Sequence, residues 1–89
     1  MSQDAEMVDR TVRSTMVDLL GIDADRVAQF DAHTPLFGSL PELDSMAVAT
    51  LLTELEDRLG IVIEDEDVDA DIFETYGALV RFAQDKALG

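Results

Sequence analysis

Hydrophobic residues recur at helical spacing in two long stretches of the chain. Steps of three or four residues place side chains on one face of an α-helix, so each stretch predicts an amphipathic helix. A glycine follows each stretch at once, and Gly21 and Gly60 are expected to end the two helices. The predicted buried stripes are Val8, Val12, Met16, Leu19 and Leu20 in the first helix and Val48, Leu51, Leu52, Leu55 and Leu59 in the second.

The second helix begins after a residue suited to capping it. The Asp44 carboxylate can accept a hydrogen bond from the backbone N–H of Met46 or Ala47, which makes Ser45 the first helical residue. Thr75 is expected to cap a third main helix in the same way. The apolar residues of that helix are Leu79, Val80, Phe82 and Ala83.

The segments between these helices lack a clear period. Residues 22–43 mix Asp, Pro, Gly and Ser with scattered apolar residues, and they predict a long loop packed down onto the helices. We expect residues 61–63 to form a buried connecting segment after the second helix. Residues 64–74 are expected to form at most a short helical turn. We therefore expect residues 1–89 to form a single all-α domain: a small antiparallel bundle of three main helices plus one short helix, with a long loop between the first two helices.

Composition narrows the classes of function. The chain has 89 residues, a formal net charge of −14 and no cysteine. A domain of this size has no room for a deep catalytic cleft. Its charge repels nucleic acid and favours basic partners, and the lack of thiols excludes disulfides and Cys-ligated zinc. Residues 1–10 include three acids and no continuous apolar run, so we expect a cytoplasmic monomer without a targeting segment or membrane insertion.

Ser45 is the strongest candidate for chemistry. A hydroxyl on the first turn of a helix is exposed, and the free N–H groups around it suit an anion. From its position alone, however, Ser45 could simply help to start the helix.

The sequence around Ser45 resembles a known motif. Asp44-Ser45-Met46, which opens an amphipathic helix after Leu40-Pro41-Glu42-Leu43, is similar to the Asp-Ser-Leu attachment motif of acyl carrier proteins. The order of predicted elements resembles that family over nearly the whole chain. The resemblance implies that the chain is not an enzyme. A phosphopantetheinyl transferase would move 4′-phosphopantetheine from coenzyme A onto Ser45, and the arm would carry acyl thioesters in fatty-acid, polyketide or a related specialised biosynthesis.

The resemblance also implies two sets of neighbouring residues. Acyl-loading, condensing or acyltransferase enzymes with basic patches would dock on the second helix, and an acyl chain would enter the core. Ala49 and Thr50 stand where fatty-acid carriers commonly have an acid, and Met46 stands where Leu is usual, which favours a dedicated pathway. The implied docking residues are Asp44, Met46, Ala49, Thr50, Thr53, Glu56 and Asp57, and the implied acyl-pocket residues are Val48, Leu52, Leu55, Ile63, Phe73 and Leu79.

Other classes of protein fit the sequence less well. A serine hydrolase needs a base, and the single histidine, His33, lies in the loop. Asp65, Asp67 and Asp69 imitate the start of an EF-hand, but Ala70 replaces the glycine and the final glutamate is missing. An acidic interaction module without a prosthetic group and a weak divalent-cation-binding domain remain as alternatives.

Overall fold

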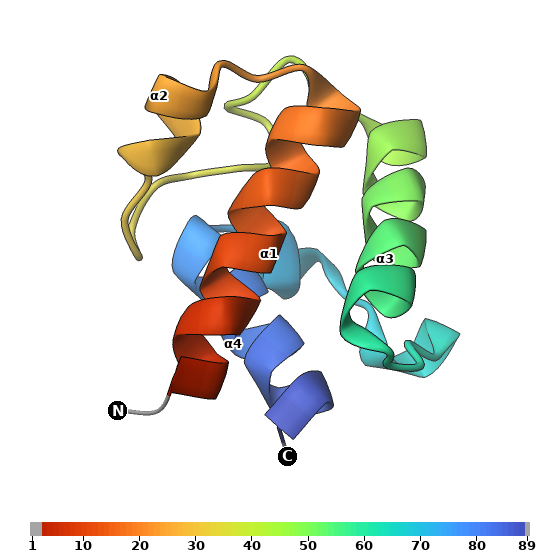
Figure 1. Cartoon of the computed structure of the whole chain (residues 1–89). Helices are drawn as coiled ribbons and strands as arrows, with labels where there is room; N and C mark the ends of the chain where they lie inside the picture. Colours follow the sequence, from red (N-terminus) through yellow and green to blue (C-terminus); the bar gives the residue numbers. More distant parts are fainter. Residues whose placement is uncertain (1–2, 89) are drawn as a thin grey trace.

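The fold is built from helices alone, as a computed structural model of residues 3–88 shows (Figure 1). Within these residues three helices are long, and the other three elements span five residues or fewer. The prediction of an all-α domain with three main helices is therefore confirmed. In chain order the elements are α1 (Gln3–Leu20), α2 (Ala24–Ala28), α3 (Ser45–Leu59), the 3₁₀ helices η1 (Asp65–Asp67) and η2 (Ala70–Phe73), and α4 (Tyr76–Leu88).

Helix α1 is the centre of the bundle. It contacts α2, α3 and α4, and α4 also packs against η2 (Figure 1). The predicted stripes meet in the core, where Val8, Val12 and Met16 of α1 are fully buried together with Leu51 and Leu55 of α3. None of the helices in residues 3–88 is long and apolar enough to cross a membrane.

The helix ends lie where the sequence predicts them. Gly21 and Gly60 follow α1 and α3 with φ angles of 68° and 66°, in the left-handed region that favours glycine. At the start of α4, the Thr75 hydroxyl oxygen accepts a hydrogen bond of 3.1 Å from the Ala78 N–H. Local capping chemistry thus sets the bounds of the main helices.

The long loop predicted for residues 22–43 is interrupted near its start, because α2 lies within it. Asp23 caps this helix by accepting a hydrogen bond of 2.9 Å from the Asp25 N–H, and Val27 is buried. The Arg13 guanidinium of α1 donates to the carbonyl oxygens of Val27 and Phe30 at 2.5 and 2.9 Å. A helix of five residues with one buried side chain is too short to show a period, and contacts with α1 stabilise it.

The prediction of a buried connector at residues 61–63 is wrong. The side chain of Val62 is 68% exposed, whereas Ile61 and Ile63 are half-buried. Successive side chains of an extended segment point to opposite sides, so the middle residue faces solvent. The next segment, 64–74, forms the two 3₁₀ helices, in agreement with the expected short helical structure.

Backbone hydrogen bonds join the second half of the long loop to the start of α4. Phe37 N–H donates to Phe73 O at 2.9 Å, and Tyr76 N–H donates to Thr34 O at 2.8 Å. The loop side chains Leu36, Leu40 and Leu43 are buried. The loop is therefore packed down, as predicted, and the segment that leads into α3 is fixed.

Tyr76 ties α4 to both α1 and the loop. Its hydroxyl donates to Asp9 Oδ1 at 2.6 Å, and the Arg13 guanidinium carbon lies 4.6 Å from the centre of its ring. The ring centres of Phe30 and Tyr76 lie 5.7 Å apart. Burial, and next the hydrogen bond to the Asp9 carboxylate, raise the pKa of Tyr76 well above its usual range. The phenol therefore stays protonated and keeps donating this bond.

We expect Gly77→Ala to destabilise the fold, although alanine is the better helix former by about 1 kcal/mol. A Cβ at Gly77 would lie 2.6 Å from the Ala32 carbonyl oxygen and 2.9 Å from its Cα, so the loop would have to move. Because the contact is with backbone atoms, its cost should lie in the upper part of the typical range for overpacking, at about 2–3 kcal/mol. After the helix gain of about 1 kcal/mol, the free energy of unfolding in urea should fall by about 1–2 kcal/mol. A variant as stable as the parent would contradict this close approach.

Candidate functional site

Ser45 is the first residue of α3, and Asp44 fixes it there. Asp44 has an extended backbone, its Oδ1 accepts from the Ala47 N–H at 2.8 Å, and its carbonyl oxygen accepts from the Val48 N–H at 2.9 Å. Both the predicted cap and the predicted helix start are confirmed. The side chain of Ser45 is exposed, so its hydroxyl can be reached from solvent.

The surroundings of Ser45 suit a bound anion. Among residues 3–88 no acceptor pairs with the backbone N–H groups of Ser45 and Met46, as is usual at the start of a helix. The first turn of α3 has no acidic side chain. Free donors and the helix dipole together favour negative charge at this position.

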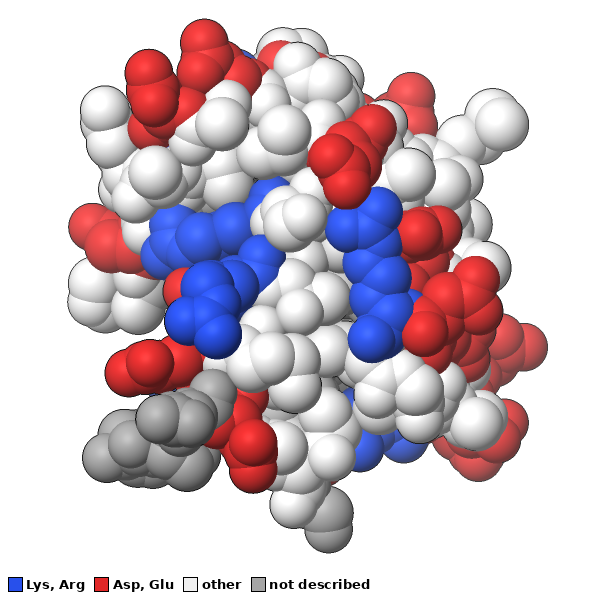
Figure 2. Space-filling view, viewed as in Figure 1, with Lys and Arg blue, Asp and Glu red and all other residues white. Residues whose placement is uncertain are grey.

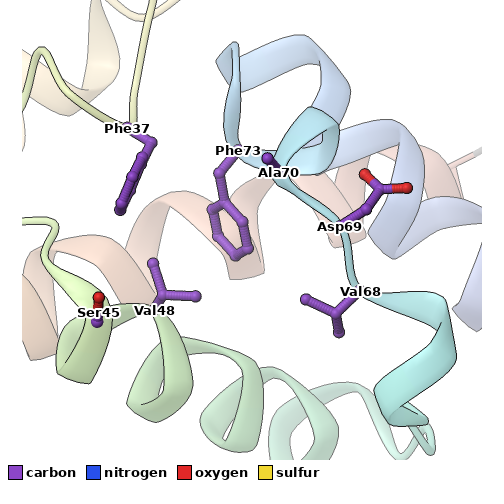
Figure 3. A pocket seen from close by; sticks show the side chains of 7 residues that line it. All are labelled: Phe37, Ser45, Val48, Val68, Asp69, Ala70 and Phe73. Atoms are coloured by element: carbon purple, nitrogen blue, oxygen red, sulfur yellow. The ribbon is translucent and has the colours of Figure 1, made fainter.

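A cavity of about 330 Å³ lies beside Ser45, between α3 and the segment that contains η1 and η2. Figure 3 shows the side chains of Val48, Phe73 and Val68 directed toward it and the Asp69 carboxylate turned away. The Asp69 Oδ1 accepts a hydrogen bond of 2.9 Å from the Asp71 N–H. The other side chains that line the cavity are largely apolar. The lining residues are Phe37, Ser45, Val48, Val68, Asp69, Ala70 and Phe73.

The structure brings only part of the predicted acyl-pocket set to this cavity. Val48 and Phe73 line it, whereas Leu55 and Leu79 are fully buried in the core. Leu52 and Ile63 are half-buried and do not line it. Phe37, Val68 and Ala70, which the sequence analysis missed, lie in segments without a hydrophobic period, so no local signal marks them.

Most of the predicted docking residues face solvent. Glu56 is the exception: it is half-buried, and its Oε2 accepts a hydrogen bond of 2.6 Å from the Ile63 N–H just after the end of α3. This carboxylate therefore has a structural role. The exposed members are Asp44, Met46, Ala49, Thr50, Thr53 and Asp57.

The acidic segment that imitates an EF-hand is held by a lysine. Lys86 Nζ of α4 lies 2.6 Å from Asp67 Oδ2, and Asp67 Oδ2 also accepts from the Glu64 N–H at 3.0 Å. The hydrogen bond from Lys86, and after it the one from Glu64, lower the pKa of Asp67. Within residues 3–88 no group of three or more His, Asp or Glu side chains is placed to hold a metal ion. His33 is exposed, and its backbone N–H donates to Asp31.

Comparison with known proteins assigns the chain to a family. Residues 10–83 match the family described as "Phosphopantetheine attachment site". The chain belongs to this family of non-catalytic carriers, whose prosthetic group is phosphopantetheine.

One solved structure of a carrier is closely similar. It is the solution NMR structure of a holo acyl carrier protein from Nitrosomonas europaea, which is 35% identical in sequence and superposes with a TM-score of 0.77. The similarity covers 88% of this chain and 92% of that one. The fold described above is therefore the fold of acyl carrier proteins.

We expect Asp44→Ala to lower the free energy of unfolding by about 0.5–2 kcal/mol, because it removes the hydrogen bond to the Ala47 N–H. Asp44→Asn keeps an oxygen that can cap, so its free energy of unfolding should stay within about 0.5 kcal/mol of the parent. Urea unfolding at neutral pH measures both. Equal losses in the two variants would mean that the carboxylate charge, rather than the cap, stabilises α3.

The ion pair between Asp67 and Lys86 should be visible in a carboxyl titration. We expect NMR to report a pKa for Asp67 below the ordinary value of about 3.9, and Lys86→Gln to raise it. Because the pKa is lowered in the folded state, the pair stabilises the η1 segment above about pH 4 and this contribution is lost as the pH falls further. Lys86→Arg is the control that keeps the charge. An Asp67 pKa that is identical in the parent and in Lys86→Gln would contradict the pairing.

Proposed function

We propose that Ser45 is the residue that bears the phosphopantetheine arm and that the chain carries acyl groups as thioesters between enzymes. The supporting observation is the exposed Ser45 side chain at the N-terminus of α3, within Asp44-Ser45-Met46, in a chain that belongs to the carrier family. When bound, the arm supplies a terminal thiol to a protein that has no cysteine.

The residues around Ser45 fit a phosphodiester. Its negative charge would lie beside the free N–H groups of Ser45 and Met46, where the helix dipole is worth about 0.3–1 kcal/mol. The Asp44 carboxylate opposes this with a charge of the same sign. The dipole therefore does not account for the motif, and we infer that Asp44 serves to fix the start of the helix and to be recognised by the transferase.

The cavity beside Ser45 fits an apolar cargo. A volume of about 330 Å³ is at the lower end of the range of about 300–1,000 Å³ that ligand pockets span. Val48, Val68 and Phe73 offer hydrocarbon surface a short distance from the attachment point. We infer that this cavity, rather than the fully buried core around Leu55 and Leu79, receives the first part of an acyl chain.

The composition of α3 favours a dedicated pathway over housekeeping fatty-acid synthesis. Ala49 and Thr50 leave the turn after Ser45 without the acid that fatty-acid carriers commonly have, and both residues are exposed. The partners would be a phosphopantetheinyl transferase and the acyl-loading, condensing or acyltransferase enzymes of a polyketide, lipid or related specialised route. The net charge of −14 would steer partners with basic surfaces toward the carrier.

We expect a broad-specificity phosphopantetheinyl transferase with coenzyme A to add one phosphopantetheine mass to the intact protein. Ser45→Ala should abolish this mass shift, because it removes the oxygen that accepts the group. Ser39→Ala is a matched control, since Ser39 is also exposed and lies in the loop before α3. Intact-protein mass spectrometry reads the result. A shift that survives in Ser45→Ala, or that is absent from the parent, would overturn the proposal.

A further inference from the structure

The cavity beside Ser45 ends at a wall that belongs to the segment of η1 and η2. Figure 3 shows Ser45 and Val68 at opposite ends of the lining, so Val68 closes the end that is farther from the serine. Val68 directly follows η1 and is half-buried. The position of η1 therefore sets how far the cavity extends along α3.

The apolar surface of α3 continues beyond this wall. Leu52 lies four residues after Val48, so the two side chains share one face of the helix. Both are half-buried, but Val48 lines the cavity and Leu52 does not. A movement of η1 and Val68 away from α3 would extend the cavity over Leu52 and make room for a longer chain.

The two ends of the wall are held in different ways. At η2, Phe73 is buried, and its carbonyl oxygen accepts a hydrogen bond of 2.9 Å from the Phe37 N–H. Helix η1, in contrast, has no buried residue. Among residues 3–88, the polar contact that joins η1 to a main helix is the ion pair of 2.6 Å between Asp67 Oδ2 and Lys86 Nζ of α4.

The charge of this segment opposes its closed position. Residues 64–74 contain seven acids and no base, and Figure 2 shows acidic side chains gathered along the edge of the molecule where η1 and the end of α3 lie. Crowded like charges repel one another, which favours a more open segment. The Asp67 and Lys86 side chains are only 29% and 28% exposed, so salt screens their attraction less than that of a fully exposed pair. The pair therefore acts against the repulsion that would move η1 outward.

We propose that Lys86 and Asp67 are positioning residues that limit the length of the acyl chain this carrier shelters. Their ion pair holds η1 to α4, so that Val68 stays at the end of the cavity and the chain stops short of Leu52. Neither residue lines the cavity, and both act through Val68. The inference rests on the proposed function, because it requires that Ser45 bears an arm whose cargo enters this cavity.

The first test is amide hydrogen exchange in the protein without its arm. Lys86→Gln removes the lysine charge, so the N–H groups of Asp67 and Val68, which bond within the η1 turn, should exchange about two- to five-fold faster. Lys86→Arg keeps a cation and should exchange like the parent. Arg81→Gln is the matched control, because it removes the same charge from α4 but Arg81 forms no ion pair within residues 3–88. It should leave both rates unchanged.

The second test locates the cargo. The transferase is supplied with butyryl-coenzyme A or dodecanoyl-coenzyme A, so that the arm arrives with its chain, and nuclear Overhauser effects between the chain and side-chain methyl groups report where the chain lies. In the parent, both chains should contact only residues that line the cavity, such as Val48 and Val68. In Lys86→Gln the dodecanoyl chain should also contact Leu52, whereas the butyryl chain should make the same contacts in both proteins.

Two results would overturn the proposal while the proposed function stands. One is a set of dodecanoyl contacts with Leu52 that is the same in the parent and in Lys86→Gln. The other is exchange of the Asp67 and Val68 N–H groups that is no faster in Lys86→Gln than in Arg81→Gln. If the parent gains no acyl arm at Ser45, the proposed function fails, and the limit on cargo length fails with it.

Discussion

The hydrogen bond from the Ala47 N–H to the Asp44 carboxylate sets the start of α3 and with it the position of Ser45. This bond makes Asp44 the cap and Ser45 the first residue of α3. Leu43 is buried just before the cap and Leu51 within the helix, so packing on both sides fixes the same register. If the sequence were shifted by one residue along the helix, each side chain would turn by about 100° around the helix axis. Ser45 would then move relative to the cavity. The cap and the buried stripe therefore fix the same register of α3, and this register leaves Ser45 exposed.

Ion pairs hold the segments around this site together in a strongly acidic chain. The Arg58 guanidinium of α3 lies 2.9 Å from the Asp18 carboxylate of α1, and the Arg26 guanidinium of α2 lies 3.2 Å from the Glu42 carboxylate just before the motif. Lys86 of α4 pairs with Asp67, which lies next to the cavity wall. Each exposed pair contributes little stability alone. Their arrangement matters more, because each joins elements that are distant in sequence. The first turns of α3 take no part in these pairs and remain available to partner enzymes.

The sequence predicted the parts of the fold that depend on local chemistry. The periods of α1 and α3, the glycines after them and the caps at Asp44 and Thr75 are all set by neighbouring residues, and all are confirmed. Helix α2 was missed because its stability depends on Arg13, which is distant in sequence. The exposure of Val62 and the hydrogen bonds from the loop to the start of α4 also depend on contacts between segments that are distant in sequence, so local patterns did not predict them.

In the candidate site, too, features set by neighbouring residues could be predicted and features set by distant contacts could not. Ser45 could be predicted because a motif and a cap mark it, whereas the cavity lining could not. Its walls combine Phe37 of the loop with Val68 and Ala70 of the acidic segment, and none of these residues belongs to a periodic pattern. Leu55 and Leu79 do belong to such patterns, and they lie in the core. Periodicity identifies residues that face a core, but it does not say which of them border a cavity.

The most direct measurement for the central claim is peptide mass spectrometry of the protein isolated from the cells that make it. The account predicts that the peptide containing Ser45 carries phosphopantetheine, with or without an acyl group on its sulfur, and that fragmentation places the group on residue 45. A fully unmodified Ser45 peptide in metabolically active cells, or the group on another residue, would contradict it.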